Sequence, residues 1–182
     1  MSIKTDYLLK ALHIISWIIF IGLCIEAGGF LVNAVMTVLL KPEAASKFWM
    51  EVDLSELYRY NDSHFITVTS LMVIVSVLRA ILFYRIVKLF HDKKFDHSQP
   101  FNEATRGFIQ TIAYLALGVG LFSYGGAKYA LNLIAQGVAI PDLYYLRLGG
   151  ADVWIFMGII LLIIASIFKK GIELQTENDL TV

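Results

Sequence analysis

Two charged side chains lie within long apolar runs, where a charge is costly unless it has a partner. Glu26 lies in the first run and Arg79 in the second. Both are about 14 or 15 residues inward from the outer end of their helix, and at about 1.5 Å per residue they reach nearly the same depth. We therefore predict an intramembrane Glu26–Arg79 ion pair. The pair would either join antiparallel helices or serve as a coupling or proton-linked site.

A second pair of opposite charges lies nearer the outer surface. Lys128 is near the outer end of the third apolar run, and Asp152 is near the outer start of the fourth. Since a short connection joins these runs, the sequence predicts a Lys128–Asp152 pair. The alternative is that Lys128 extends its ammonium group to the outer interface. Asn33 and Asn132 are expected to form hydrogen bonds between helices.

Two histidines raise the question of haem or metal binding. His13 and His91 fall near the same ends of neighbouring helices, where two imidazoles could meet. However, His91 and His97 lie in a charged loop, and the chain lacks the His-x-x-x-His and Glu-x-x-His spacings of metal sites. We therefore expect no cofactor and no metal.

Sequence motifs of enzymes are also missing. The chain has no Gly-x-Ser-x-Gly, no His-Glu-x-x-His, no phosphate-binding glycine loop and no paired intramembrane aspartates. We therefore expect that the protein is not an enzyme. Its formal net charge is zero, which argues against direct nucleic-acid binding, and its one cysteine, Cys24, excludes an intramolecular disulfide.

The elements that carry these residues follow from composition. The chain has 182 residues, 58% hydrophobic and 16% charged, whereas soluble domains are about 25% charged. Four apolar runs are long enough to cross about 30 Å of hydrocarbon as helices, which need about 20 residues. They cover about 11–39, 64–90, 107–135 and 151–168. We predict an all-α integral membrane four-helix bundle forming one domain, 1–182, with a short tail at 171–182.

The distribution of basic residues predicts the orientation of these helices. If the helices alternate in direction, one side receives nine of them: Lys4, Lys10, Arg85, Lys88, Lys93, Lys94, Arg106, Lys169 and Lys170. On the other side, five basic residues are diluted by acidic ones. Because basic residues accumulate on the cytoplasmic side, we expect both termini to be cytoplasmic.

The largest outer loop, 41–63, has apolar residues among its acidic ones. Phe48, Trp49 and Val52 have helical spacing, and Pro42 suits a first helical turn. A short amphipathic helix at the outer interface is one interpretation. A cap packed over the bundle is the other.

Two segments on the terminal side resemble a known family. The middle loop reads Lys-Lys-Phe-Asp-His-Ser-Gln-Pro-Phe-Asn over 93–102, and the chain ends Glu-Leu-Gln-Thr-Glu-Asn-Asp-Leu-Thr-Val over 173–182. Together with the four spans, these segments resemble the bacterial membrane family DUF2975, a domain of unknown function. The resemblance covers essentially the whole chain, and its ending is the most specific part.

The resemblance implies a regulatory role, because members are often encoded beside a small helix-turn-helix regulator. That association suggests a membrane protein that captures or controls a transcription regulator. An acidic tail with a few apolar side chains could bind a basic DNA-binding face. The candidate partner-binding residues are Glu173, Leu174, Glu177, Asp179, Leu180, Pro100 and Phe101. A frayed, solvated tail is the alternative.

Two other functions remain open. A small transporter or ion-linked carrier could use Glu26, Arg79 and Asn33 as a polar path, and a homo-oligomer would supply a larger pore. A protein that confers immunity to a peptide toxin would also need only a bundle that binds a partner. Besides the lipid bilayer, the sequence identifies no partner by itself.

Overall fold

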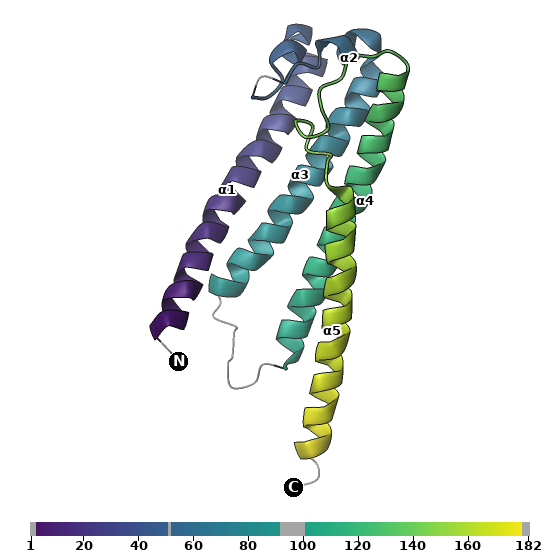
Figure 1. Cartoon of the computed structure of the whole chain (residues 1–182). Coiled ribbons are helices and arrows are strands. Elements are labelled where there is room, and N and C mark those ends of the chain that lie inside the picture. Colours follow the sequence, from purple (N-terminus) through teal and green to yellow (C-terminus); the bar gives the residue numbers. More distant parts are fainter. Residues whose placement is uncertain (1–2, 51, 92–100, 180–182) are drawn as a thin grey trace.

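The computed structural model describes residues 3–50, 52–91 and 101–179, and these form four long helices (Figure 1). The helices are α1 (Ile3–Leu39), α3 (Asp62–His91), α4 (Glu103–Ala135) and α5 (Ala151–Asp179). All four are long and apolar enough to cross a membrane. The predicted all-α membrane architecture is therefore confirmed.

Both ends of α4 have capping motifs. At its start, Asn102 accepts a hydrogen bond through Oδ1 from the Thr105 amide at 2.8 Å, which satisfies one free donor of the first turn. At its end, Gly137 has a φ of +88°. The amides of Gly137 and Val138 donate back to the Ile134 and Leu133 carbonyls, so the helix closes in a Schellman motif.

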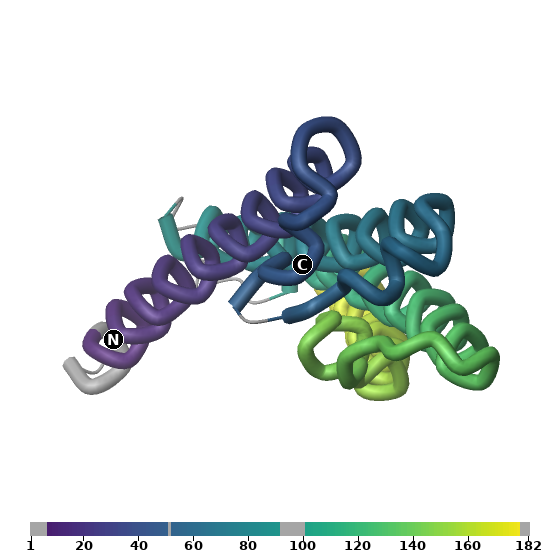
Figure 2. The backbone as a smooth tube through the Cα atoms, turned by 90° about the horizontal axis from the view of Figure 1, so that it is seen from above, coloured from purple at the N-terminus to yellow at the C-terminus, as the bar shows by residue number. Residues whose placement is uncertain are grey.

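The four helices form an open array in the order α1, α3, α4, α5 (Figure 2). α1 packs on α3, α3 on α4, and α4 on α5. Within the described residues α1 does not pack on α4 or α5. The two outermost helices therefore each have only one helical neighbour, and most of their apolar surface is exposed in the isolated chain.

The outer loop forms a packed cap at the end opposite the termini. It contains a 3-10 helix, η1 (Pro42–Lys47), and a short α-helix, α2 (Ser55–Tyr60). Phe48, Leu54 and Leu57 are fully buried, and Phe48 stacks on Phe30 of α1 with ring centroids 6.2 Å apart. Of the two interpretations of this loop, the structure therefore agrees with the cap packed over the bundle.

The cap contacts α1 closely at one glycine. A Cβ at Gly29 would overlap the indole ring of Trp49, whereas a Cβ at the adjacent Gly28 would meet nothing within 4 Å. Gly29 therefore provides the space that lets Trp49 lie against the helix.

The connection from α4 to α5, residues 136–150, descends alongside α4 instead of remaining at its end (Figure 1). Leu148 packs on Gly126, and an ideal Cβ at Gly120 would lie 3.1 Å from the Ala151 carbonyl oxygen. α5 consequently begins level with the middle of α4. Non-helical backbone is stable at membrane depth only where protein or a polar cavity surrounds it, and Leu146 and Leu148 are fully buried here. We call residues 136–150 the re-entrant connection.

Because α5 begins low, its other end projects past the rest of the array. The sequence predicted that this span ends near 168, but the helix continues without interruption to Asp179 (Figure 1). The described part of the tail is therefore helical.

Candidate functional site

The re-entrant connection places Arg147 beside Glu26, the glutamate within α1. Nε of Arg147 donates a hydrogen bond to Oε2 of Glu26 at 2.8 Å, and the two side chains are 32% and 14% exposed, respectively. Such a charge-assisted bond is roughly twice as strong as a neutral one. The pair connects α1 to the α4–α5 half of the molecule, which α1 does not otherwise contact through its helices.

Arg147 is also unusual in its backbone. Its φ is +59°, a left-handed conformation that normally favours glycine. It lies at the end of a single helical turn, where the Leu148 amide donates to the Leu143 carbonyl and the Arg147 amide donates to the Tyr144 carbonyl. This arrangement is a Schellman motif with arginine at the position that glycine commonly occupies. The residue in this left-handed conformation is the one whose side chain makes the ion pair with Glu26.

Arg79 lies beside this pair without joining it, so the predicted Glu26–Arg79 ion pair needs correction. In the described chain Glu26 pairs with Arg147, and the guanidinium of Arg79 lies over the Trp154 ring, 5.5 Å from its centroid. The depth estimate was sound, since Arg79 lines the same cavity as Arg147, the partner of Glu26. The sequence placed Arg147 at the outer surface and could not anticipate the descent of its loop.

A cavity of ≈ 560 Å³ lies against these residues. α1 contributes Ile19 and Leu23, α3 contributes Arg79 and Phe83, and the other side is formed by the re-entrant connection with Trp154 of α5. The cavity therefore joins apolar walls to two arginines. Within the described chain, the Nε–H of Arg79 is buried and has no hydrogen-bond partner.

The predicted Lys128–Asp152 pair does not form in the described structure. Both residues are exposed, and no ion pair joins them. The reason is the low start of α5: Asp152 is near the level of Gly120, and Lys128 is eight residues, about 12 Å, further along α4. Asn33 also differs from expectation, since its Nδ2 donates to the Gly29 carbonyl of its own helix at 2.8 Å.

His13 and His91 do meet, at the end of the array that holds both termini. Their ring centroids are 6.4 Å apart in an edge-to-face arrangement, and His13 also contacts Phe90. Nε2 of His13 accepts a hydrogen bond from Nε1 of Trp17 at 3.1 Å. The two histidines thus form an aromatic contact between α1 and α3.

The same end of the array holds the candidate partner-binding residues. Phe101 packs its ring on Phe168 of α5, with centroids 5.2 Å apart, and a Cβ at Gly171 would lie 2.6 Å from Phe101 Cδ1. The start of α4 is therefore fastened to α5 where that helix leaves the array. Pro100 and Leu180 lie outside the described residues, as does the side chain of Asp179.

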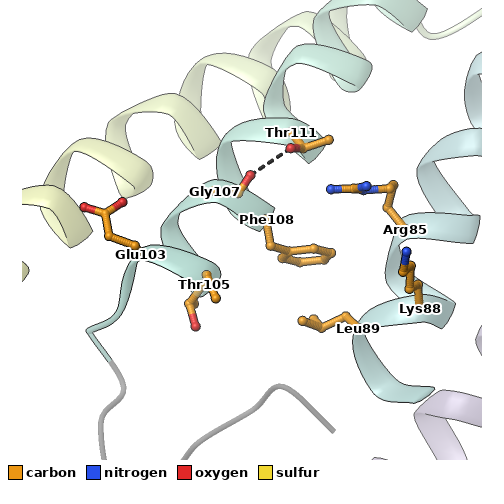
Figure 3. Close-up of a pocket in the computed structure, with 9 residues that line it drawn as sticks. Arg85, Lys88, Leu89, Glu103, Thr105, Gly107, Phe108 and Thr111 are labelled. Carbon is orange, nitrogen blue, oxygen red and sulfur yellow. Dashed lines mark hydrogen bonds between the residues drawn. The ribbon is translucent and has the colours of Figure 1, made fainter. Parts of the chain in front are cut away.

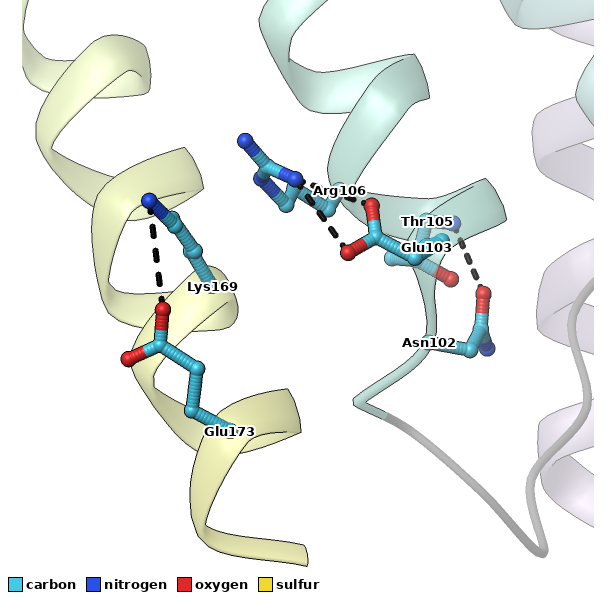
Figure 4. A network of polar contacts seen from close by, with 6 residues as sticks. All are labelled: Asn102, Glu103, Thr105, Arg106, Lys169 and Glu173. Atoms are coloured by element: carbon cyan, nitrogen blue, oxygen red, sulfur yellow. Dashed lines mark hydrogen bonds and ion pairs between the residues drawn. The ribbon is translucent and has the colours of Figure 1, made fainter. Parts of the chain in front are cut away.

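Beyond this fastening, α5 presents an exposed surface. Glu173, Leu174 and Glu177 are all exposed, and Leu174 is 54% accessible. Figure 4 shows Lys169 reaching Glu173 one turn away, at 3.8 Å, and Arg106 pairing with Glu103 at 2.9 Å. Exposed pairs of this kind contribute at most about 1 kcal/mol, so Glu173 can exchange Lys169 for a partner at little cost. We call Phe101, Glu173, Leu174 and Glu177 the terminal surface.

A pocket of ≈ 420 Å³, lined by two basic side chains and the acidic Glu103, lies between α3 and α4 (Figure 3). Arg85 and Lys88 line it from α3, and Phe108 and Thr111 line it from α4. The Thr111 hydroxyl donates to the Gly107 carbonyl at 2.8 Å, so it is already satisfied within its own helix.

Sequence reasoning missed Arg147 as a member of the intramembrane site. One available signal was the composition of 136–150, which carries Val138, Ile140, Leu143, Leu146 and Leu148. Such a share of apolar residues is excessive for a solvated turn and indicates burial.

Comparison with known proteins identifies the family of this chain. No curated protein and no solved structure matches it. A family model, described as a protein of unknown function (DUF2975), matches residues 36–182, which include Arg79, Arg147 and the terminal surface but not Glu26. The chain therefore belongs to the DUF2975 family of proteins of unknown function.

Proposed function

We propose that this protein is a membrane-embedded regulator in a bacterial inner membrane, whose cytoplasmic terminal surface captures a small helix-turn-helix transcription regulator. The observation that carries the proposal is the projection of α5. This helix continues to Asp179, eleven residues beyond the predicted end of its span at 168, and is fastened to α4 by Phe101.

The chemistry of the projecting segment suits a DNA-binding partner. Glu173 and Glu177 are one helical turn apart and share a face, with Leu174 beside them. DNA-binding proteins present basic residues to phosphate, so an acidic helix with one apolar side chain can occupy that surface and compete with DNA. A preformed helix loses less conformational entropy on binding than a disordered tail does.

The proposed orientation follows from the positions of the basic side chains. Arg85, Lys88, Arg106, Lys169 and Lys170 all lie toward the end that holds the termini. In the cap at the other end, Lys47 and Arg59 are offset by Glu43, Asp53 and Glu56. An excess of basic residues is characteristic of the cytoplasmic side, which is where a transcription regulator is found.

The test is capture of the regulator by tagged protein extracted in mild detergent, with bound proteins identified by mass spectrometry. Full-length protein is compared with the double variant Glu173→Lys/Glu177→Lys and with a chain truncated after Lys170. Glu43→Lys, an equally exposed charge reversal in the cap, is the matched control.

We expect a helix-turn-helix protein to be recovered with the full-length chain and with Glu43→Lys. Recovery should fall at least about tenfold with the other two variants, since each lost charged contact is worth about 1.5–3 kcal/mol. The proposal is wrong if the full-length chain recovers no such regulator, or if the double variant recovers it equally well.

A further inference from the structure

We propose that the cavity beside Glu26 and Arg147 binds the oxyanion head, a carboxylate or a phosphate, of an anionic ligand, and that Arg79 is the residue that receives it. The site lies among the membrane-spanning helices, apart from the terminal surface. It therefore stands independently of the proposed partner.

The pairing within the cluster is the first argument. Two arginines and two carboxylates meet at the cavity, and one carboxylate, that of Glu26, is already bound to Arg147 at 2.8 Å. The remaining acidic side chain at the cavity, Asp142, is exposed and accepts a hydrogen bond from the Tyr144 amide at 2.7 Å. Neither carboxylate is therefore paired with Arg79 in the described structure.

The second argument is the position of the Arg79 guanidinium. Arg79 is about 12 residues, or about 18 Å, from the terminal end of α3, which is near the middle of the membrane. A charge at this depth is expensive, and intramembrane ionisable residues normally have a partner. Trp154 covers one face of the guanidinium, and Nε–H remains buried without an acceptor in the described chain. The planar donor fork of arginine matches a carboxylate or phosphate in two parallel hydrogen bonds.

The walls of the cavity indicate what accompanies the anionic head. Ile19, Leu23 and Phe83 are apolar, and the volume of ≈ 560 Å³ falls in the range of about 300–1,000 Å³ typical of small-molecule sites. The flanking helices α1 and α5 do not pack on each other over their described lengths. An apolar chain attached to the head can therefore extend along the seam between them. A single-chain amphiphile from the bilayer fits this shape, and a soluble oxyanion shares the same head chemistry.

The experiment measures binding of dodecanoate to full-length protein in nanodiscs of zwitterionic phosphatidylcholine. Dodecanol, which has the same chain and no charge, is the matched ligand. A dodecanoate brominated on the carbon next to its carboxylate reports position, because that bromine would lie near Trp154 and bromine quenches a nearby indole. Its quenching should include a component that Trp154→Phe removes. Inorganic phosphate is added as a competitor in a separate series.

We expect dodecanoate to bind at least about tenfold more tightly than dodecanol, and Arg79→Gln to weaken dodecanoate by about tenfold or more. Arg59→Gln, an exposed substitution in the cap, should leave the affinity unchanged. Binding that resists inorganic phosphate supports the site with a membrane amphiphile as the ligand. Full displacement by phosphate supports the site with a soluble oxyanion.

Equal binding of dodecanoate and dodecanol would overturn the proposal, as would undiminished binding to folded Arg79→Gln. If Arg79→Gln does not fold, the comparison of the two ligands on unmodified protein still decides the question.

Discussion

Arg147 Nε donates a hydrogen bond to Glu26 Oε2 at 2.8 Å, although 121 residues separate the two in the chain. The bond joins two halves of the molecule that the helices leave apart, because α1 packs on α3 but not on α4 or α5 in the described structure. A glutamate in a long apolar run is thus satisfied by an arginine from a connection between helices.

Removing one member of this pair should destabilise the protein. We expect Glu26→Gln and Arg147→Gln each to cost about 1–3 kcal/mol, less than the 3–5 kcal/mol of a fully buried pair because Arg147 is 32% exposed. The double variant should cost less than the sum of the two. Unfolding in detergent, followed by circular dichroism, measures all three. The exposed pair Arg59–Glu56 provides the control, where Arg59→Gln should change stability by less than about 1 kcal/mol. Strictly additive costs would contradict the pairing.

The left-handed backbone of Arg147 predicts an unusual order among its variants. Arg147→Ala loses the ion pair and keeps the unfavourable φ of +59°, whereas Arg147→Gly loses the pair and relieves the backbone. We therefore expect the glycine variant to be more stable than the alanine variant by about 1 kcal/mol, the reverse of the usual order within helices. The same unfolding measurement compares them. An alanine variant at least as stable as the glycine variant would show that the backbone is not strained there.

Neighbouring glycines in α1 should respond oppositely to alanine. Gly29→Ala places a methyl group in the indole ring of Trp49 and should destabilise the protein by about 1–3 kcal/mol. Gly28→Ala meets nothing within 4 Å and should stabilise the helix by up to about 1 kcal/mol. Thermal unfolding of the two variants side by side tests the packing of the cap on α1. Similar midpoints for both would mean that Trp49 does not lie against Gly29.

The cap contains a carboxylate whose titration the structure predicts. Hydrogen bonds from the Ser55 side chain and amide, the latter at 2.8 Å, lower the pKa of Asp53 below its ordinary value. A lowered folded pKa means that the carboxylate stabilises the cap above about pH 4, and that this contribution disappears as the pH falls through the folded pKa. Ser55→Ala should raise the pKa, measured by NMR titration of the Asp53 carboxyl carbon. Ser46→Ala, whose hydroxyl bonds the Glu43 carbonyl, should leave it unchanged.

The proposed orientation can be tested with single cysteines. In a Cys24→Ser background, Lys47→Cys places a thiol in the cap and Thr176→Cys places one on the projecting part of α5. A membrane-impermeant maleimide added to intact cells should label the first, and should label the second only after lysis. Labelling of Thr176→Cys in intact cells would place the terminal surface outside.

The helices could be predicted from the sequence because hydropathy reports lipid contact directly. The expected spans end at 39, 90 and 135 and the helices end at Leu39, His91 and Ala135, while the fourth begins at Ala151 as expected. The end of α5 was missed because its projecting residues are polar, and polarity alone does not distinguish a solvated helix from a loop.

The intramembrane site was predicted only in part, because depth follows from counting residues and contacts do not. Glu26 and Arg79 were placed at one depth, and in the structure Arg79 lines the same cavity as Arg147, the partner of Glu26. The ion pair was assigned to the wrong arginine because a short connection was assumed to remain at the surface. The descent of 136–150 depends on small residues of the preceding helix, such as Gly120 and Gly126, whose space α5 and the connection fill.

The order of the helices in space has a consequence for biosynthesis. α1, α3, α4 and α5 each pack on the next in the chain, so each helix can dock on its predecessor as soon as it enters the membrane. The Arg147–Glu26 bond is different, because the connection that carries Arg147 follows three of the four helices out of the ribosome. Until that connection has been synthesised, Glu26 lies in α1 without Arg147. The newly made chain therefore has an incomplete stage, in which the first helix is docked and its charge is not yet neutralised.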